Sequence, residues 1–140
     1  MIEEDLIILA EDDDNHKYLF ERAFSKVAGG ERLIIFREGE SLMDYLQNEL
    51  NPLPRVVFLD IHMPGISGLD CLKEIRENDR LVDLPVVIHS TSNDNADERQ
   101  ALLYKANFYL RKSGDPEELR YIIGKVLQMD WSEKILRPFT

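Results

Sequence analysis

Acidic, hydroxyl and ammonium side chains follow several separate apolar runs of this 140-residue sequence. In chain order they are Glu11, Asp12, Asp60, Ser90, Thr91 and Lys112. Carboxylates that gather repel one another, by about 4 kcal/mol for two charges about 4 Å apart at an effective dielectric constant of 20. Oxygen ligands with open positions suit Mg²⁺, which together with a lysine would offset this repulsion. An aspartate opposite a hydroxyl and an ammonium can accept a phosphoryl group, so Asp60 is the candidate nucleophile.

Each of these residues alone has a simpler explanation. An acid after a strand commonly caps a helix, and the run 11–14 could cap the first helix through Asp13 or Asp14. A lone lysine at the end of a strand is usually a surface residue. The chemical interpretation is favoured because acids, a hydroxyl and an ammonium recur together at four strand ends.

The elements that must position these residues alternate along the chain. Apolar runs predict strands at 6–10, 32–36, 56–59, 85–88 and 108–110. Helical spacing predicts helices at 16–27, 41–50, 69–76, 97–105 and 116–129, the last capped by Asp115 before Pro116. This order predicts an α/β fold, a doubly wound parallel sheet with helices on both faces. Sites in such sheets form at the carboxyl ends of the strands, where the candidate residues lie.

Composition limits the class of protein. The formal charge is −10, which argues against nucleic acid or an anionic membrane surface as the main partner. Cys71 is the single cysteine, so an internal disulfide is impossible and a reducing compartment fits. The acidic N-terminus lacks the pattern of a signal peptide, and no run approaches the roughly 20 apolar residues of a membrane span. We therefore expect a cytoplasmic protein with one domain over 1–140, its last helix followed by a tail at 130–140.

The segment VVFLDIHMPGISGLDCLKEIR, residues 56–76, carries a resemblance to a known family. Asp60, Met63, Pro64 and Gly68 have the D-x-x-M-P-x-x-x-G spacing of the phosphorylation-site region in receiver domains of two-component response regulators. The resemblance covers about residues 5–129. It implies a flavodoxin-like strand order of 2-1-3-4-5.

The resemblance also implies a metal site. Asp12 would bind Mg²⁺ directly, Glu11 would bind it mostly through water, and Asp60 would be the second direct ligand as well as the phosphoacceptor. His62 lies where the family donates a backbone carbonyl to the metal, so its ring need not take part.

The resemblance also implies which residues contact the phosphoryl group. Ser90 matches the switch position, which carries a hydroxyl. Thr91 matches the neighbouring position, whose backbone N–H contacts the phosphoryl group. Lys112 matches the lysine that binds the phosphoryl group. Tyr109 matches an aromatic residue that rotates on activation. The family usually has proline after the lysine, commonly with a cis bond, whereas this chain has Ser113. A cis bond here would cost about 2.5–4 kcal/mol, which leaves the geometry of this loop open.

The implied function is a phosphorelay switch rather than an enzyme. A histidine kinase or phosphotransfer protein would donate the phosphoryl group to Asp60. The face made by the fourth helix, fifth strand and fifth helix would then shift and bind a downstream target protein. A monomer or weak dimer is expected.

Two alternatives stay open. An aspartate-nucleophile phosphatase has a similar sheet, but usually carries a second Asp two residues after the first, where this chain has His62. A receiver-like docking module without phosphorylation would tolerate Ser113, although the complete set of acid, hydroxyl and lysine argues against it.

Overall fold

Parallel strands form the centre of the structure. The computed structural model describes residues 2–131, which form five strands and five helices. The strands are β1 (Ile2–Ala10), β2 (Arg32–Phe36), β3 (Leu53–Leu59), β4 (Val86–Ser90) and β5 (Phe108–Arg111). All pairings are parallel and the order is β2-β1-β3-β4-β5, which confirms the predicted doubly wound sheet and its strand order.

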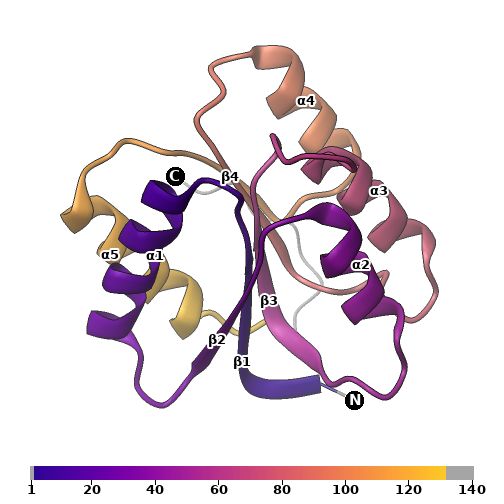
Figure 1. Ribbon diagram of the computed structural model, residues 1–140, viewed down its shortest axis with the longest axis horizontal. Coiled ribbons are helices and arrows are strands. Elements are labelled where there is room, and N and C mark those ends of the chain that lie inside the picture. The colour runs from indigo at the N-terminus through magenta and orange to yellow at the C-terminus, as the bar shows by residue number, and fades with distance from the viewer. Residues whose placement is uncertain (1, 132–140) are drawn as a thin grey trace.

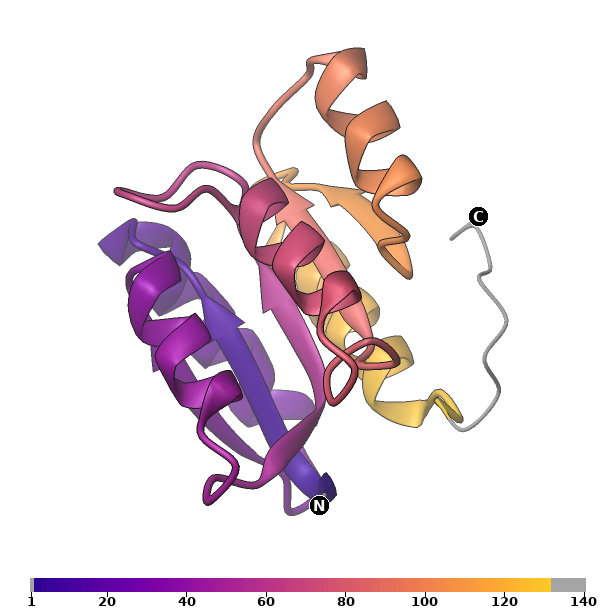
Figure 2. The ribbon, with the colours of Figure 1, turned by 90° about the vertical axis from the view of Figure 1, so that its right-hand side faces the viewer.

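Helices cover both faces of the sheet, as Figures 1 and 2 show. They are α1 (Asp14–Val27), α2 (Gly39–Gln47), α3 (Gly68–Glu77), α4 (Asn95–Leu103) and α5 (Pro116–Gln128). Helices α1 and α5 lie on one face, and α2, α3 and α4 lie on the other (Figure 1).

Each face of the sheet has its own apolar core because side chains alternate along a strand. Ile7 of β1 belongs to the core under α1 and α5. Its neighbour Ile8 belongs to the core under α2 and α3, and both residues are fully buried. Central strands buried on both faces explain why the sequence shows continuous apolar runs rather than alternation.

Side-chain caps begin four of the described helices. Asp13 accepts a hydrogen bond from the amide of His16 at 2.9 Å, so it is the cap of α1 that the sequence offered as one of two candidates. Asp115 caps α5 through the amide of Glu117, as predicted. Because Asp13 fills this role, Glu11 and Asp12 are not needed to begin α1.

The end of α2 differs from the prediction. The helix ends at Gln47 rather than at position 50, and the side chain of Leu50 is 92% exposed in the following turn. The amide of Leu50 instead donates to Oδ1 of Asn48 at 3.0 Å, since asparagine side chains stabilise turns. Strand β3 begins at Leu53, before the predicted start at position 56, so Pro54 lies in the strand.

The described part of the C-terminal tail packs on the domain. The indole N–H of Trp131 donates to the carbonyl oxygen of Val126 at 3.3 Å, and its ring meets that of Phe108 edge-on at 5.7 Å. Residues 132–140 of the predicted tail lie outside the described residues. Among residues 2–131, we find no helix whose length and apolar character would let it cross a bilayer.

Candidate functional site

The sheet itself fixes the backbone of the site. Hydrogen bonds continue past the strand ends: the amide of Asp60 donates to the carbonyl of Ala10 at 3.1 Å, and that of Glu11 to the last residue of β2 at 2.9 Å. On the other side, the amide of Lys112 donates to the carbonyl of Ser90 at 2.8 Å. The residues that follow β1, β3 and β5 are therefore held at the same edge, as the strand-end argument predicted.

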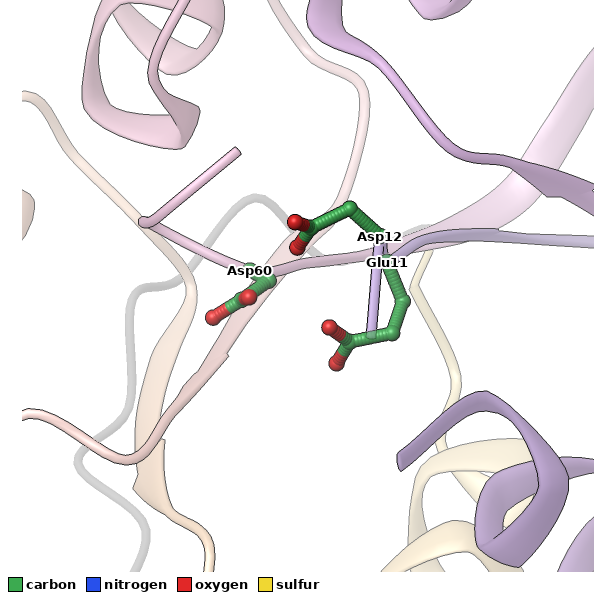
Figure 3. Close-up of side chains that lie close together, drawn as sticks. All are labelled: Glu11, Asp12 and Asp60. Atoms are coloured by element: carbon green, nitrogen blue, oxygen red, sulfur yellow. The ribbon is translucent and has the colours of Figure 1, made fainter. Parts of the chain in front are cut away.

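Three carboxylates meet at this edge. Oxygen atoms of Glu11, Asp12 and Asp60 all lie within 4.8 Å of one another, on side chains that extend from the ends of β1 and β3 (Figure 3). Glu11 is 2% and Asp60 6% exposed, while Asp12 is half-buried. Because every candidate ligand atom in this group is an oxygen, the group fits a hard divalent cation such as Mg²⁺ better than a soft metal.

Lys112 supplies the positive charge at this edge. Its side chain is 8% exposed, its ammonium contacts Oε1 of Glu11, and it lies 3.7 Å from Oδ1 of Asp60. The ammonium also lies 3.2 Å from Nδ1 of His16. One ammonium opposes three carboxylates, so the cluster keeps an excess of negative charge.

The pKa of the Asp60 carboxyl is raised from 3.8 to about 7, chiefly by burial and then by the charge of Glu11, while Lys112 partly opposes both effects. A protonated Asp60 is a poor nucleophile and a poor ligand. A cation in the cluster would favour the ionised form for the same electrostatic reason.

Gly68 allows α3 to begin against the backbone of Asp60. A Cβ atom at this position would overlap the carbonyl oxygen of Asp60. The amide of Gly68 donates to the carbonyl of Ile61 at 2.8 Å. The close approach explains why glycine stands eight residues after Asp60 in the motif.

Two serines at the end of β4 are connected by hydrogen bonds to α4. Ser90 is fully buried and its Oγ accepts a hydrogen bond from the amide of Ser92 at 3.2 Å, while Thr91 is exposed. Ser92 in turn donates through Oγ to Oδ2 of Asp97 on α4 at 2.7 Å. Sequence reasoning gave Ser92 and Asp97 no role, because the hydrogen bond between them is visible only in three dimensions.

Tyr109 and His62 lie beside this group. Tyr109 is partly exposed on β5, yet its hydroxyl oxygen is buried and makes no hydrogen bond with the described residues; burial raises its pKa. Nε2 of His62 lies 3.8 Å from Oδ2 of Asp97, so the His62 ring approaches α4.

The loop after Lys112 settles a question that the sequence left open. No cis peptide bond occurs among residues 2–131, so the bond between Lys112 and Ser113 is trans. Oγ of Ser113 accepts a hydrogen bond from the amide of Asp115 at 3.2 Å, just before α5.

Two histidines that line a cavity with Lys112 had no role in the predicted site. His16 and His89 line a small cavity of about 70 Å³ between α1 and the β5–α5 loop, together with Lys112 and Phe20. His89 is 8% exposed and its pKa is lowered to about 3, by burial first and then by the charge of Lys112. The one available signal was a histidine in the otherwise apolar run VVIHS.

Comparison with known proteins agrees with this arrangement. Residues 7–124 match the family described as the response regulator receiver domain. The chain belongs to this family. This receiver domain is similar to the probable methanogenesis regulatory protein FilR2 of Methanothrix harundinacea, at 33% identity over 124 residues, covering 86% of this chain and 80% of that protein.

Proteins of similar length include response regulator Rcp1 of Synechocystis. Rcp1 is 29% identical over 137 residues, covering 95% of this receiver domain and 92% of Rcp1. The structure of its Mn²⁺-bound form has a TM-score of 0.78 and covers 86% of this chain and 90% of its own, at 30% identity. The phosphorylated cyanobacterial phytochrome response regulator RcpA has a TM-score of 0.77 at 27% identity, covering 86% of this chain and 89% of its own.

Proposed function

We propose that this receiver domain is a cytoplasmic phosphorelay switch, and that Asp60 accepts a phosphoryl group from a histidine kinase or phosphotransfer protein. The observation that carries the proposal is the meeting of Asp60 with Glu11, Asp12 and Lys112 at one edge of the sheet. A nucleophile, a set of oxygen ligands and a cation are the components that phosphoryl transfer to a carboxylate requires.

The metal site is proposed for Mg²⁺. Glu11, Asp12 and Asp60 would hold it through their carboxylates, with the backbone carbonyl of His62 as a further ligand. When bound, Mg²⁺ supplies positive charge that neutralises the transferred phosphoryl group and keeps Asp60 ionised.

In the transfer step, an oxygen of the Asp60 carboxylate attacks the phosphorus atom. The bond between phosphorus and the donor's nitrogen breaks, and the nitrogen keeps the electron pair. Lys112, the hydroxyl of Ser90 and the backbone N–H of Thr91 bind the phosphoryl oxygens, where charge must be balanced. The product is an aspartyl phosphate. Water later hydrolyses it, which releases inorganic phosphate and restores the Asp60 carboxylate.

The signal is proposed to travel from Ser90 to α4. When the Ser90 hydroxyl turns toward the phosphoryl group, it leaves the amide of Ser92, whose own hydroxyl is bonded to Asp97 of α4. Tyr109 then moves into the space that Ser90 vacates. A downstream protein that binds the altered α4–β5–α5 face more tightly than the unaltered face shifts the population of domains toward the altered conformation.

Incubation with acetyl phosphate or phosphoramidate and Mg²⁺, followed by mass spectrometry of the intact protein, tests the proposal. The wild type should gain the mass of one phosphoryl group, and Asp60→Asn should gain none. Asp44→Asn, which removes an exposed acid from α2, is the matched control and should behave as wild type.

The same material separates the alternatives. Steady turnover of a generic phosphomonoester would support the aspartate-nucleophile phosphatase instead. Failure to bind Mg²⁺ and to form any adduct would support a docking module that is not phosphorylated.

A further inference from the structure

The surroundings of the Lys112 ammonium define where its protons point. An ammonium has three N–H donors and no acceptor. One donor faces Oε1 of Glu11, which it contacts, and a second faces Nδ1 of His16 at 3.2 Å. Asp60 lies at 3.7 Å, which is beyond hydrogen-bond distance. Two partners therefore hold the ammonium, and the third donor is left on the side of Asp60.

The contact with His16 fixes the form of its ring. Because an ammonium can only donate, Nδ1 of His16 must be the acceptor, so the ring proton lies on Nε2. A charged imidazole would instead place two positive groups 3.2 Å apart. The carboxylates nearest to Nδ1 offer it no hydrogen bond as a donor, since Asp13 lies at 3.8 Å and Glu11 at 4.0 Å.

We propose that His16 is a positioning residue for Lys112: its Nδ1 accepts the second N–H of the ammonium, so that the third N–H is aimed at the phosphoryl group carried by Asp60. The inference rests on the proposed function of Asp60. His16 itself does not touch the reacting atoms.

A purely structural role explains less of what is observed. The start of α1 depends on the backbone amide of His16, which Asp13 caps, and not on the ring. The ring is one-third exposed, whereas the Lys112 side chain it contacts is 8% exposed. Without Nδ1 of His16, one N–H of the largely buried Lys112 ammonium would lack a hydrogen-bond acceptor, which is costly for a charged group.

The test compares three replacements of His16. Asn carries an acceptor oxygen bonded to Cγ, at the place of Nδ1, whereas the oxygen of Gln lies further along the side chain. We expect the rate of phosphoryl uptake from phosphoramidate, with excess Mg²⁺, to fall about tenfold in His16→Ala and His16→Gln. His16→Asn should stay within about twofold of wild type. Asn15→Ala, an exposed neighbour on α1, is the matched control.

Nitrogen-15 NMR gives a second readout that a structural role would not move. The wild-type ring should show Nε2 protonated and Nδ1 bare at about pH 8, and the Lys112 ammonium signal should shift in the Ala and Gln variants but not in Asn. Thermal unfolding serves as the check that each variant is folded.

A proton on Nδ1, or phosphoryl uptake in His16→Ala that is equal to or faster than in wild type, overturns the inference. If the wild type takes no phosphoryl group, the proposed function fails, and the ring tautomer still decides whether the contact exists.

Discussion

Replacement of Asp60 by asparagine measures how strongly the carboxylate cluster opposes folding when no metal is present. The Asp60 carboxyl is 6% exposed and its pKa is raised to about 7, chiefly by burial and then by the charge of Glu11. The folded protein therefore binds a proton at this position that the unfolded chain releases near pH 3.8. Stability must fall as pH rises from about 4 to about 7, and the full cost is present above that range.

The size of this cost follows from the two pKa values. A change from 3.8 to about 7, at about 1.36 kcal/mol per unit, corresponds to roughly 4 kcal/mol in the free energy of unfolding. Asparagine has nearly the same shape and no charge. We expect Asp60→Asn to raise the free energy of unfolding by about 4 kcal/mol at pH 8.5 and by about 2 kcal/mol at pH 5.

Urea unfolding in the presence of EDTA, followed by circular dichroism, is the assay. The control Asp44→Asn removes one exposed charge from a chain of net charge −10, and separates relief of the cluster from a change in net charge. Addition of Mg²⁺ should stabilise the wild type, by about 2.7 kcal/mol at a concentration 100-fold above its Kd, and should leave Asp60→Asn nearly unchanged.

Equal stability of wild type and Asp60→Asn at pH 8.5, or a gain that does not depend on pH, would refute the reasoning. Either result would mean that ionisation of the Asp60 carboxyl in the folded protein does not carry the proposed cost. Stabilisation of Asp44→Asn by the same amount would assign the effect to net charge.

Three further measurements test other parts of the site. Gly68→Ala should lower the free energy of unfolding by about 1–3 kcal/mol in urea titrations, because its Cβ overlaps the carbonyl of Asp60; a neutral effect would contradict that contact. The affinity for Mg²⁺, measured by calorimetry, should fall by up to about tenfold per pH unit below pH 7, because a proton competes with the metal at Asp60. An affinity that does not change between pH 5 and pH 8 would count against this competition. Ser92→Ala should speed amide hydrogen exchange in the first turn of α4, because it removes the 2.7 Å hydrogen bond to Asp97, with unchanged exchange as the contrary outcome.

The fold was largely predictable because its strongest signals are local. Continuous apolar runs predicted buried parallel strands, and Asp115 before Pro116 predicted the start of α5. The order of the strands came from the family resemblance, since alternation alone does not determine which strands are neighbours. The end of α2 was missed because the amide of Leu50 bonds to the side chain of Asn48 rather than continuing the helix.

The site was predictable to the extent that the strand-end rule applies. That rule brought Glu11, Asp60 and Lys112 together from positions far apart in the sequence. It could not find His16, which lies on a helix and reaches Lys112 across 96 positions of the chain. Whether a side chain on a helix reaches a residue at a strand end depends on packing, which the strand-end rule does not describe.

The turn that ends α2 has a practical consequence. It precedes β3, so it lies at the edge of the sheet opposite the carboxylates. Cys71 is fully buried, and burial raises its pKa to about 12, so it is a poor target for thiol reagents. A cysteine in place of the exposed Leu50 would therefore be the one readily labelled thiol, and a fluorophore attached there could report on the domain without touching its chemistry.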